Sequence, residues 1–440
     1  MVHHVIDFLY TVTMLAVFFA STYAWGRLAT CLLYKQAPRS WPFTSAVGLA
    51  LWIFVGGLLN ASHLAYGAAL DGVLVLGLIL LAGQAIRSLR TPEGRRVPAA
   101  WARGLQAPTA EWLPTVLITA VGAFRIATLV PAGVFNYHDD FQSYLVPPVR
   151  MLQTGAMTSG AFDLLAPSVH GAQAFFHGFF LRRFPITAIN AFDLIFCFLL
   201  TGFLIDSVGR RLRIRWPCRF IAVLLVIFIH PLYVNISALY SCSAMLVAAV
   251  YASLVMVESD AAASTGFRIR AAIPVCILVG SLITLKVTLL TFAVLYLSLL
   301  APILWWRSSS ARSGAWLAVW LVLTTAAFLA PWIGLLIEDY VSLATTATAR
   351  IEARGTAGGG VLLSTERRPG HAFLVPRVLV RSFRRLFVLR HLDGVFVRRS
   401  PWPFRPGSPG ARGPLAPCGR RGVLRRDRQL PATPAVPAFG

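Results

Sequence analysis

Long apolar runs recur along most of this chain and restrict its fold more than any other feature. About 20 consecutive apolar residues make a helix long enough to cross the hydrocarbon core of a bilayer. We count ten such runs, near residues 5–25, 43–62, 67–86, 112–131, 186–206, 219–235, 237–257, 271–285, 287–306 and 314–337. The sequence therefore predicts an all-α, polytopic transmembrane helix bundle of about ten spans.

Two of these runs need interpretation. The first, 5–25, has no basic segment before it and no small-residue cleavage site, so we interpret it as a retained span and not a signal peptide. The stretch 271–306 is too long for one span and contains Lys286 near its middle. We predict two helices that meet near this lysine. Composition supports the membrane class, since 57% of residues are hydrophobic and only 13% are charged.

Basic residues between the spans predict the orientation of the bundle. Arginine and lysine gather in five short connections, at 26–42, 87–111, 207–218, 258–270 and 307–313. In a ten-span topology all five lie on one side, which the positive-inside rule makes cytoplasmic. The connection 132–185 then faces outward.

This outward loop is the longest connection before the C-terminal tail, and an adjacent pair of acids lies near its start. Asp139 and Asp140 are two of only 17 acidic residues in the chain. Carboxylates close to a bilayer are costly unless paired, solvated or used. We predict that one of them is a general base for an acceptor hydroxyl, or an electrostatic partner of the counter-charge of a departing phosphate. The alternative is that either aspartate caps the short helix that follows. His138 beside them is a candidate proton relay or a solvated loop residue.

Further along the loop, four phenylalanines predict a helix. Phe175, Phe176, Phe179 and Phe180 would share one broad apolar face, with Arg182 and Arg183 at its end. Such a helix is expected to lie in the membrane interface and not to span the bilayer.

Four short elements of the loop resemble the GT-C superfamily of integral membrane glycosyltransferases, in one of its uncharacterised bacterial branches. They read Asn136-Tyr-His-Asp139-Asp140, Tyr144-Leu-Val-Pro147, Met151-Leu-Gln-Thr-Gly155 and Gly171-Ala-Gln173-Ala-Phe175. The resemblance covers roughly residues 110–335. It implies that Asp139 or Asp140 takes the place of the catalytic acid/base, in a protein of the bacterial inner membrane.

The same resemblance implies a donor and a reaction. The donor would be a polyprenyl-phosphate-linked sugar, and transfer to an envelope acceptor would occur on the outer face. His138, Arg150, Gln173 and Lys286 are the predicted substrate-binding residues, and Arg182 and Arg183 are further candidates for the phosphate. The bilayer is an expected partner and nucleic acid is not. No residue set is assigned to a metal, and a need for a divalent metal is left open.

Lys286 and the other charges inside apolar runs keep two alternatives open. A membrane transporter or flippase would also use Asp71, Arg125, Asp193 and Lys286. Arg125 is expected to pair with Asp71 or Asp193, in a functional or a purely structural contact. Lys286 could equally be a turn residue between two short helices. The second alternative is a non-catalytic membrane subunit of an envelope-glycan assembly.

The chain changes character after about residue 345. From 350 to 440 it has 18 Arg, no Lys and four acids, with many Pro and Gly. We divide it into a transmembrane domain, 1–345, and a basic tail, 346–440. The composition predicts disorder. A second hypothesis is that the tail is translated out of frame, which would make the molecule a truncated copy.

Overall fold

The protein is helical throughout the part of the chain that its structure, a computed structural model, describes. The described residues are 2–34, 40–90, 109–132, 144–157, 171–184, 189–228, 238–258, 265–306 and 311–356, and they contain no strand. Nine of their helices are long and apolar enough to cross a membrane. The predicted all-α polytopic bundle is therefore confirmed.

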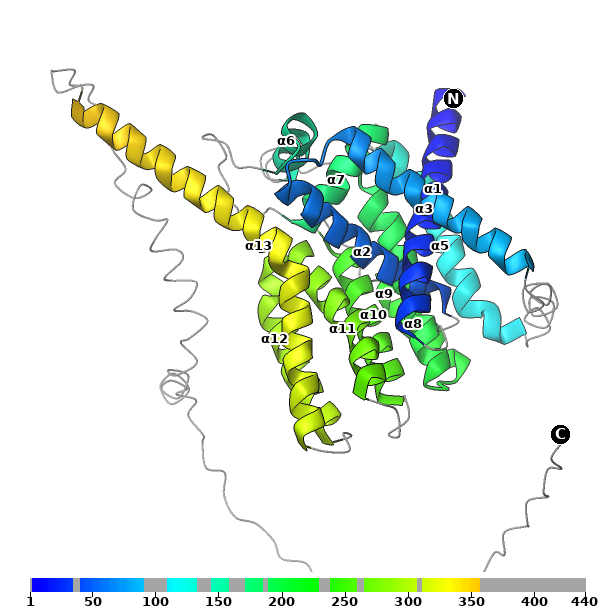
Figure 1. Cartoon of the computed structure of the whole chain (residues 1–440). Helices are drawn as coiled ribbons and strands as arrows, with labels where there is room; N and C mark the ends of the chain where they lie inside the picture. Colours follow the sequence, from blue (N-terminus) through cyan, green and yellow to red (C-terminus); the bar gives the residue numbers. More distant parts are fainter. Residues whose placement is uncertain are drawn as a thin grey trace, which may run out of the picture. The chain divides into compact units, whose positions relative to one another are not determined.

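The helices follow one another along the chain as coloured in Figure 1. Short 3₁₀ segments (η2 and η7) and a π-helical segment (η6) interrupt the α-helices. The elements are α1 (Val2–Leu33), α2 (Trp41–Ala61), α3 (Gly67–Arg90), η2 (Thr109–Trp112), α5 (Leu113–Ala132), α6 (Val146–Thr154), α7 (Ala172–Arg183), η6 (Phe192–Cys197), α8 (Phe198–Arg211), α9 (Trp216–Phe228), α10 (Tyr240–Glu258), α11 (Thr265–Leu285), η7 (Val287–Leu289), α12 (Leu290–Trp306) and α13 (Ala311–Thr356).

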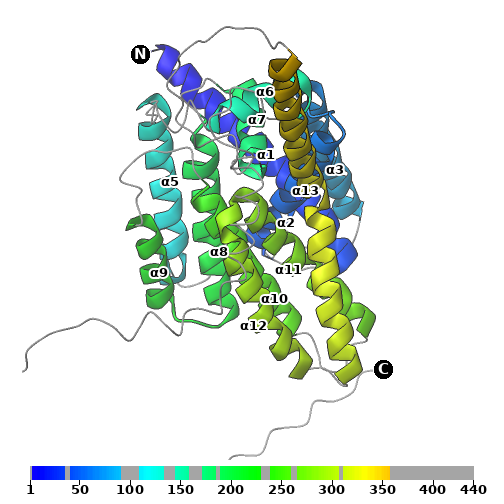
Figure 2. The same ribbon diagram turned by 90° about the vertical axis from the view of Figure 1, so that its left-hand side faces the viewer.

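Burial separates the inner helices of the bundle from the outer ones. The apolar windows of α2 and α11 are 72% and 78% buried, whereas those of α3 and α12 are only 22% and 17% buried. The outer helices expose large apolar side chains such as Ile79 and Leu299. Extended apolar surface of this kind fits a lipid environment and not water. Figure 2 shows α5 and α9 side by side next to α8.

The shorter helix α9 covers the start of the sixth predicted span. It is apolar but ends at Phe228. The remainder of that prediction, 229–235, lies outside the described residues.

Helices α1 and α2 approach each other closely because glycine replaces larger residues where they cross. A Cβ added to Gly26 would lie 1.7 Å from the Thr44 carbonyl oxygen, and one added to Gly48 would lie 1.7 Å from that of Thr22. Small residues allow such backbone contact between membrane helices. Close to the crossing, Phe18 is almost fully buried in edge contact with Trp52, at a centroid distance of 5.2 Å.

The predicted division of 271–306 is confirmed. Helix α11 ends at Leu285, Lys286 is extended with φ −152° and ψ 107°, and η7 and α12 follow. Lys286 is exposed at this turn. It therefore lies between two spans and not within one.

Helix α13 is longer than the predicted tenth span. It runs to Thr356, past the predicted domain boundary at residue 345, and Pro331 lies inside it. Figure 1 shows the helix bending along its length. The predictions of disorder or a shifted frame for the tail fall, from residue 357 onward, outside the described residues.

Candidate functional site

Helices α6 and α7 lie at the end of the bundle where α1 begins (Figures 1 and 2). They belong to the loop in which the sequence places the candidate acids. Asp139, Asp140 and His138 themselves lie outside the described residues. The N-cap position of α6 is held by Leu145. Neither aspartate therefore occupies the N-cap of α6, the first described helix after them.

The segment that follows α6 docks it against α2. Gly155 adopts φ 84°, the left-handed conformation that ends helices, and its carbonyl accepts a hydrogen bond of 2.8 Å from the Ala65 amide. The side-chain oxygen of buried Asn60 accepts another, of 3.0 Å, from the Met157 amide. The Met-Leu-Gln-Thr-Gly element thus has a structural role, because its glycine allows the turn.

Helix α7 is buried on every side from Ala172 to Phe180. The predicted helix exists, but its burial is not confined to one face, because α2, α11 and η6 surround it. Phe176 stacks on Phe192 with ring centroids 4.4 Å apart. At its start, a Cβ on Gly171 would lie 2.2 Å from the Thr284 carbonyl oxygen. The start of α7 therefore adjoins the end of α11, two residues before Lys286.

A chain of buried polar groups links α7 to α10 and η6. The Ser241 hydroxyl donates to the Gln173 side-chain oxygen at 3.4 Å, and the Gln173 amide donates to His177 Nε2 at 3.0 Å. The Ser241 backbone amide donates to Asp193 at 2.8 Å. Buried polar groups are costly without partners, so this chain fixes the depth and rotation of α7.

Burial strongly lowers the pKa of His177, the histidine in this series of buried polar groups. It lowers the pKa of His177 to about 3, against an opposing backbone hydrogen bond with Tyr144. Since Nε2 accepts from Gln173, a neutral ring carries its proton on Nδ1. His177 is therefore a neutral structural partner near pH 7 and not a proton donor.

Asp193 anchors the N-terminus of α10. Its carboxylate accepts the backbone amides of Leu239, Tyr240 and Ser241 at 3.2, 3.1 and 2.8 Å. The first amides of a helix have no partner within the helix and favour a negative charge. Asp193 lies in the π-helical segment η6, a distortion that often marks functional regions.

The predicted pairing of Arg125 with Asp71 or Asp193 is not found among the described residues. Buried Arg125 donates to the Leu194 carbonyl and to the Tyr240 hydroxyl, both at 3.1 Å. Its guanidinium also lies 3.8 Å from the centre of the Phe198 ring. These contacts join α5 to η6, α8 and α10, and within the described part of the chain Arg125 has no acidic partner.

Asp71 instead holds the two arginines at the end of α7. Arg182 lies 2.8 Å from its carboxylate, and Arg183 pairs with the other oxygen. This acidic partner ties both arginines, and with them α7, to α3. Of the other candidate phosphate-binding cations, Arg150 is half-buried on α6 and Lys286 is exposed beside the start of α7.

The structure therefore gathers part of the predicted site and adds residues to it. Gln173 and Lys286 come from adjoining segments, and Arg150 lies on the helix that packs against α7. Sequence reasoning missed His177 and Ser241 as partners of Gln173. His177 could have been found, because it follows Gln173 by four residues on one face of the helix. No cluster suited to a metal occurs within the described ranges.

The fold and these buried charges define a polytopic helical membrane protein. Comparison with protein families, with curated proteins and with solved structures gives no significant match.

Proposed function

We propose that the protein is a membrane glycosyltransferase of the GT-C type. It transfers a sugar from a polyprenyl-phosphate donor to an envelope acceptor on the outer face of the bacterial inner membrane. The observation that carries the proposal is the anchoring of α6 and α7 in the bundle. The start of α7, which belongs to the same predicted loop as the acid pair, adjoins the end of α11 just before Lys286.

In this mechanism, Asp139 or Asp140 removes the proton from the acceptor hydroxyl as that oxygen attacks the anomeric carbon. The bond from that carbon to the donor phosphate breaks, and the polyprenyl phosphate leaves with the bonding electron pair. Arg150 and Lys286 stabilise the charge on the departing phosphate. Gln173 acts through its contacts with His177 and Ser241, which hold α7 in position.

The test replaces each acid separately, as Asp139→Asn and Asp140→Asn, in protein reconstituted with a polyprenyl-phosphate sugar. Loss of sugar transfer by at least a hundredfold in one variant is expected, because general-base catalysis contributes about that much or more. Asp163→Asn is the matched control, since Asp163 is another acid of the same loop. Full activity in both test variants would refute the mechanism.

The two alternatives give different results in the same preparation. A flippase would move a labelled lipid-linked sugar between leaflets without forming product. A non-catalytic subunit would do neither alone. Three of the four charges that a transporter would use have structural partners here: Asp71 pairs with arginines, Asp193 binds backbone amides, and Arg125 donates to Leu194 and Tyr240.

A further inference from the structure

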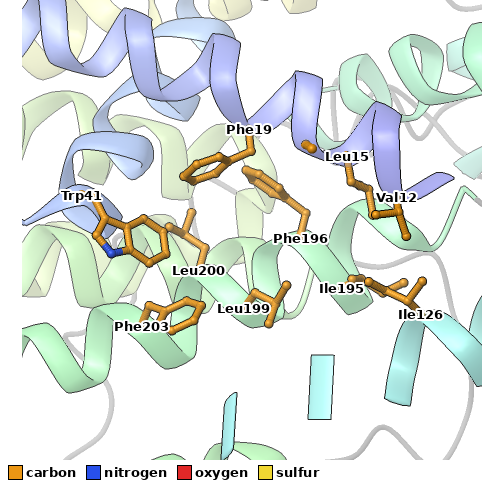
Figure 3. Close-up of a pocket in the computed structure, with 11 residues that line it drawn as sticks. Val12, Leu15, Phe19, Trp41, Ile126, Ile195, Phe196, Leu199, Leu200 and Phe203 are labelled. Atoms are coloured by element: carbon orange, nitrogen blue, oxygen red, sulfur yellow. The ribbon is translucent and has the colours of Figure 1, made fainter. Parts of the chain in front are cut away.

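An apolar cavity of about 250 Å³ lies between α1, α5 and the η6–α8 helix. Figure 3 shows side chains of α1 and α8 facing each other across it, with Trp41 and Phe203 at one end. These two rings also line a polar pocket of about 620 Å³ that adjoins the cavity there. The described residues that line the cavity are all apolar, so the cavity does not select a charged ligand.

The charges beside the polar pocket are balanced within the protein. The arginines and the acids that pair with them are Arg210, Arg211 and Arg219 with Asp206, Glu111 and Glu258. Three arginines thus meet three acids, and a buried charge that already has an opposite partner needs no ligand to neutralise it. We therefore searched the ion pairs of the bundle for a cluster that is not balanced.

The cluster near the start of α3 has two arginines for one acid. Arg182 and Arg183, the last two residues of α7, both pair with Asp71. Within the described part of the chain, neither arginine pairs with a second acid. The cluster therefore carries one positive charge that the protein does not compensate.

The uncompensated charge is accessible at Arg182. The side chain of this arginine is 41% exposed. Its hydrogen bonds to Asp71 come from Nε and Nη2, so the described contacts leave the Nη1 donors unused. Arginine N–H groups match phosphate oxygens in geometry and charge. An exposed guanidinium with unused donors is therefore suited to a phosphate group.

The cluster borders the side of α3 that faces lipid. Asp71 lies near the start of an apolar span that is only 22% buried. One turn further along, Val75 is 49% exposed, and a Cβ on Gly72 would meet nothing within 4 Å. Tyr66, directly before α3, is also exposed, and tyrosine is enriched where the membrane meets water. The surplus charge thus lies at the level where lipid headgroups join their acyl chains.

We propose that this cluster binds the phosphate of one anionic phospholipid, whose acyl chains lie along the exposed side of α3. By the predicted topology the lipid belongs to the outer leaflet. The site is separate from the region proposed for sugar transfer. Arg182 follows Gly171, which adjoins the end of α11, by 11 residues, or about 16 Å along α7 at about 1.5 Å per residue. The inference does not depend on the proposed transfer reaction.

The experiment measures binding of phosphatidylglycerol to the full-length protein in detergent by native mass spectrometry. Arg182→Gln should weaken binding about fivefold, which is the contribution of one basic residue near an anionic lipid. Arg215→Gln is the matched control, because it removes the same charge from an exposed position between α8 and α9. It should leave binding unchanged.

Asp71→Asn distinguishes ligand binding from a purely structural role of the cluster. This substitution raises the local charge by one, so phosphatidylglycerol should bind about fivefold more tightly. Weaker or unchanged binding by this variant, or unchanged binding by Arg182→Gln, would overturn the proposal. If Asp71→Asn elutes as misfolded protein, Arg182→Gln decides the matter, because Arg183 keeps its pairing with Asp71 in that variant.

Three other ligands test the class of the occupant. Phosphatidylcholine, whose headgroup has no net charge, should bind about fivefold more weakly. Glycerol phosphate, which has no acyl chain, should not compete, and full competition by it would overturn the proposal. Polyprenyl phosphate at equal concentration should not displace phosphatidylglycerol. Displacement would assign the cluster to the sugar donor and would also overturn the proposal.

Discussion

Replacement of Gly48 by alanine tests the closest helix contact in the bundle. The added methyl would lie 1.7 Å from the Thr22 carbonyl oxygen and 2.8 Å from the Gly26 amide nitrogen. Ordinary van der Waals contact requires at least 3.4 Å between these atoms. The methyl would lie at 1.7 Å, so the two helix backbones must move apart by about 1.7 Å. The obstacle is backbone on both sides, so no side chain can rotate away to relieve it.

The expected loss follows from what this separation disrupts. A gap of about 0.5–1 Å already forfeits a quarter to a half of each dispersion contact. The Phe18–Trp52 contact, between the same two helices, would open with the crossing. Overpacking of well-packed cores costs about 1–3 kcal/mol, and we expect Gly48→Ala to reach the upper end, about 3 kcal/mol.

Helix α3 provides matched controls for this substitution. A Cβ on Gly72 or Gly83 meets nothing within 4 Å, so alanine there should stabilise the helix by about 0.5–1 kcal/mol. At Gly77 the methyl would lie 1.9 Å from Ser21 Oγ, a side-chain atom that can rotate, so an intermediate loss is expected. Thermal unfolding in detergent ranks the stabilities of these glycine-to-alanine variants. If Gly48→Ala is as stable as Gly72→Ala, the reasoning is refuted.

Three further predictions concern the polar contacts of the α7 region. Because the pKa of buried His177 is lowered to about 3, the unfolded chain binds the proton first as pH falls below about 6.5. The free energy of unfolding should therefore drop by up to about 1.4 kcal/mol per pH unit between about pH 6 and 4. His177→Gln should remove that part of the slope in pH-dependent unfolding, and an unchanged slope would contradict it. Asp193→Ala leaves two buried amides and one part-buried amide without an acceptor and should cost about 3 kcal/mol or more, whereas Asp193→Asn should cost less. Equal melting temperatures of the Asp193→Ala and unaltered proteins would argue against the anchoring role. Asp71→Asn should cost only about 1 kcal/mol, because its ion pairs with Arg182 and Arg183 are partly exposed, and chemical denaturation in detergent measures this loss.

The sequence determined the membrane class and most of the helices. Hydropathy is a local property of about 20 residues, so it predicted nearly every span and the break at Lys286 before any contact was known. It also predicted the helix that carries Phe175–Phe180, although not its complete burial. The candidate acids Asp139 and Asp140 remain a sequence-based prediction.

Tertiary structure decided which polar groups meet. The carboxylate of Asp193 binds amides more than 40 positions away along the chain, and Asp71 pairs with arginines more than 100 positions away. Such partners cannot be predicted from local composition, because they depend on which faces of several helices pack together. The same applies to the apolar cavity and its polar end, which α1, α2, α5 and α8 form jointly. From the sequence one can predict only that a buried charge needs a partner. Which residue becomes that partner depends on how the helices of the bundle pack.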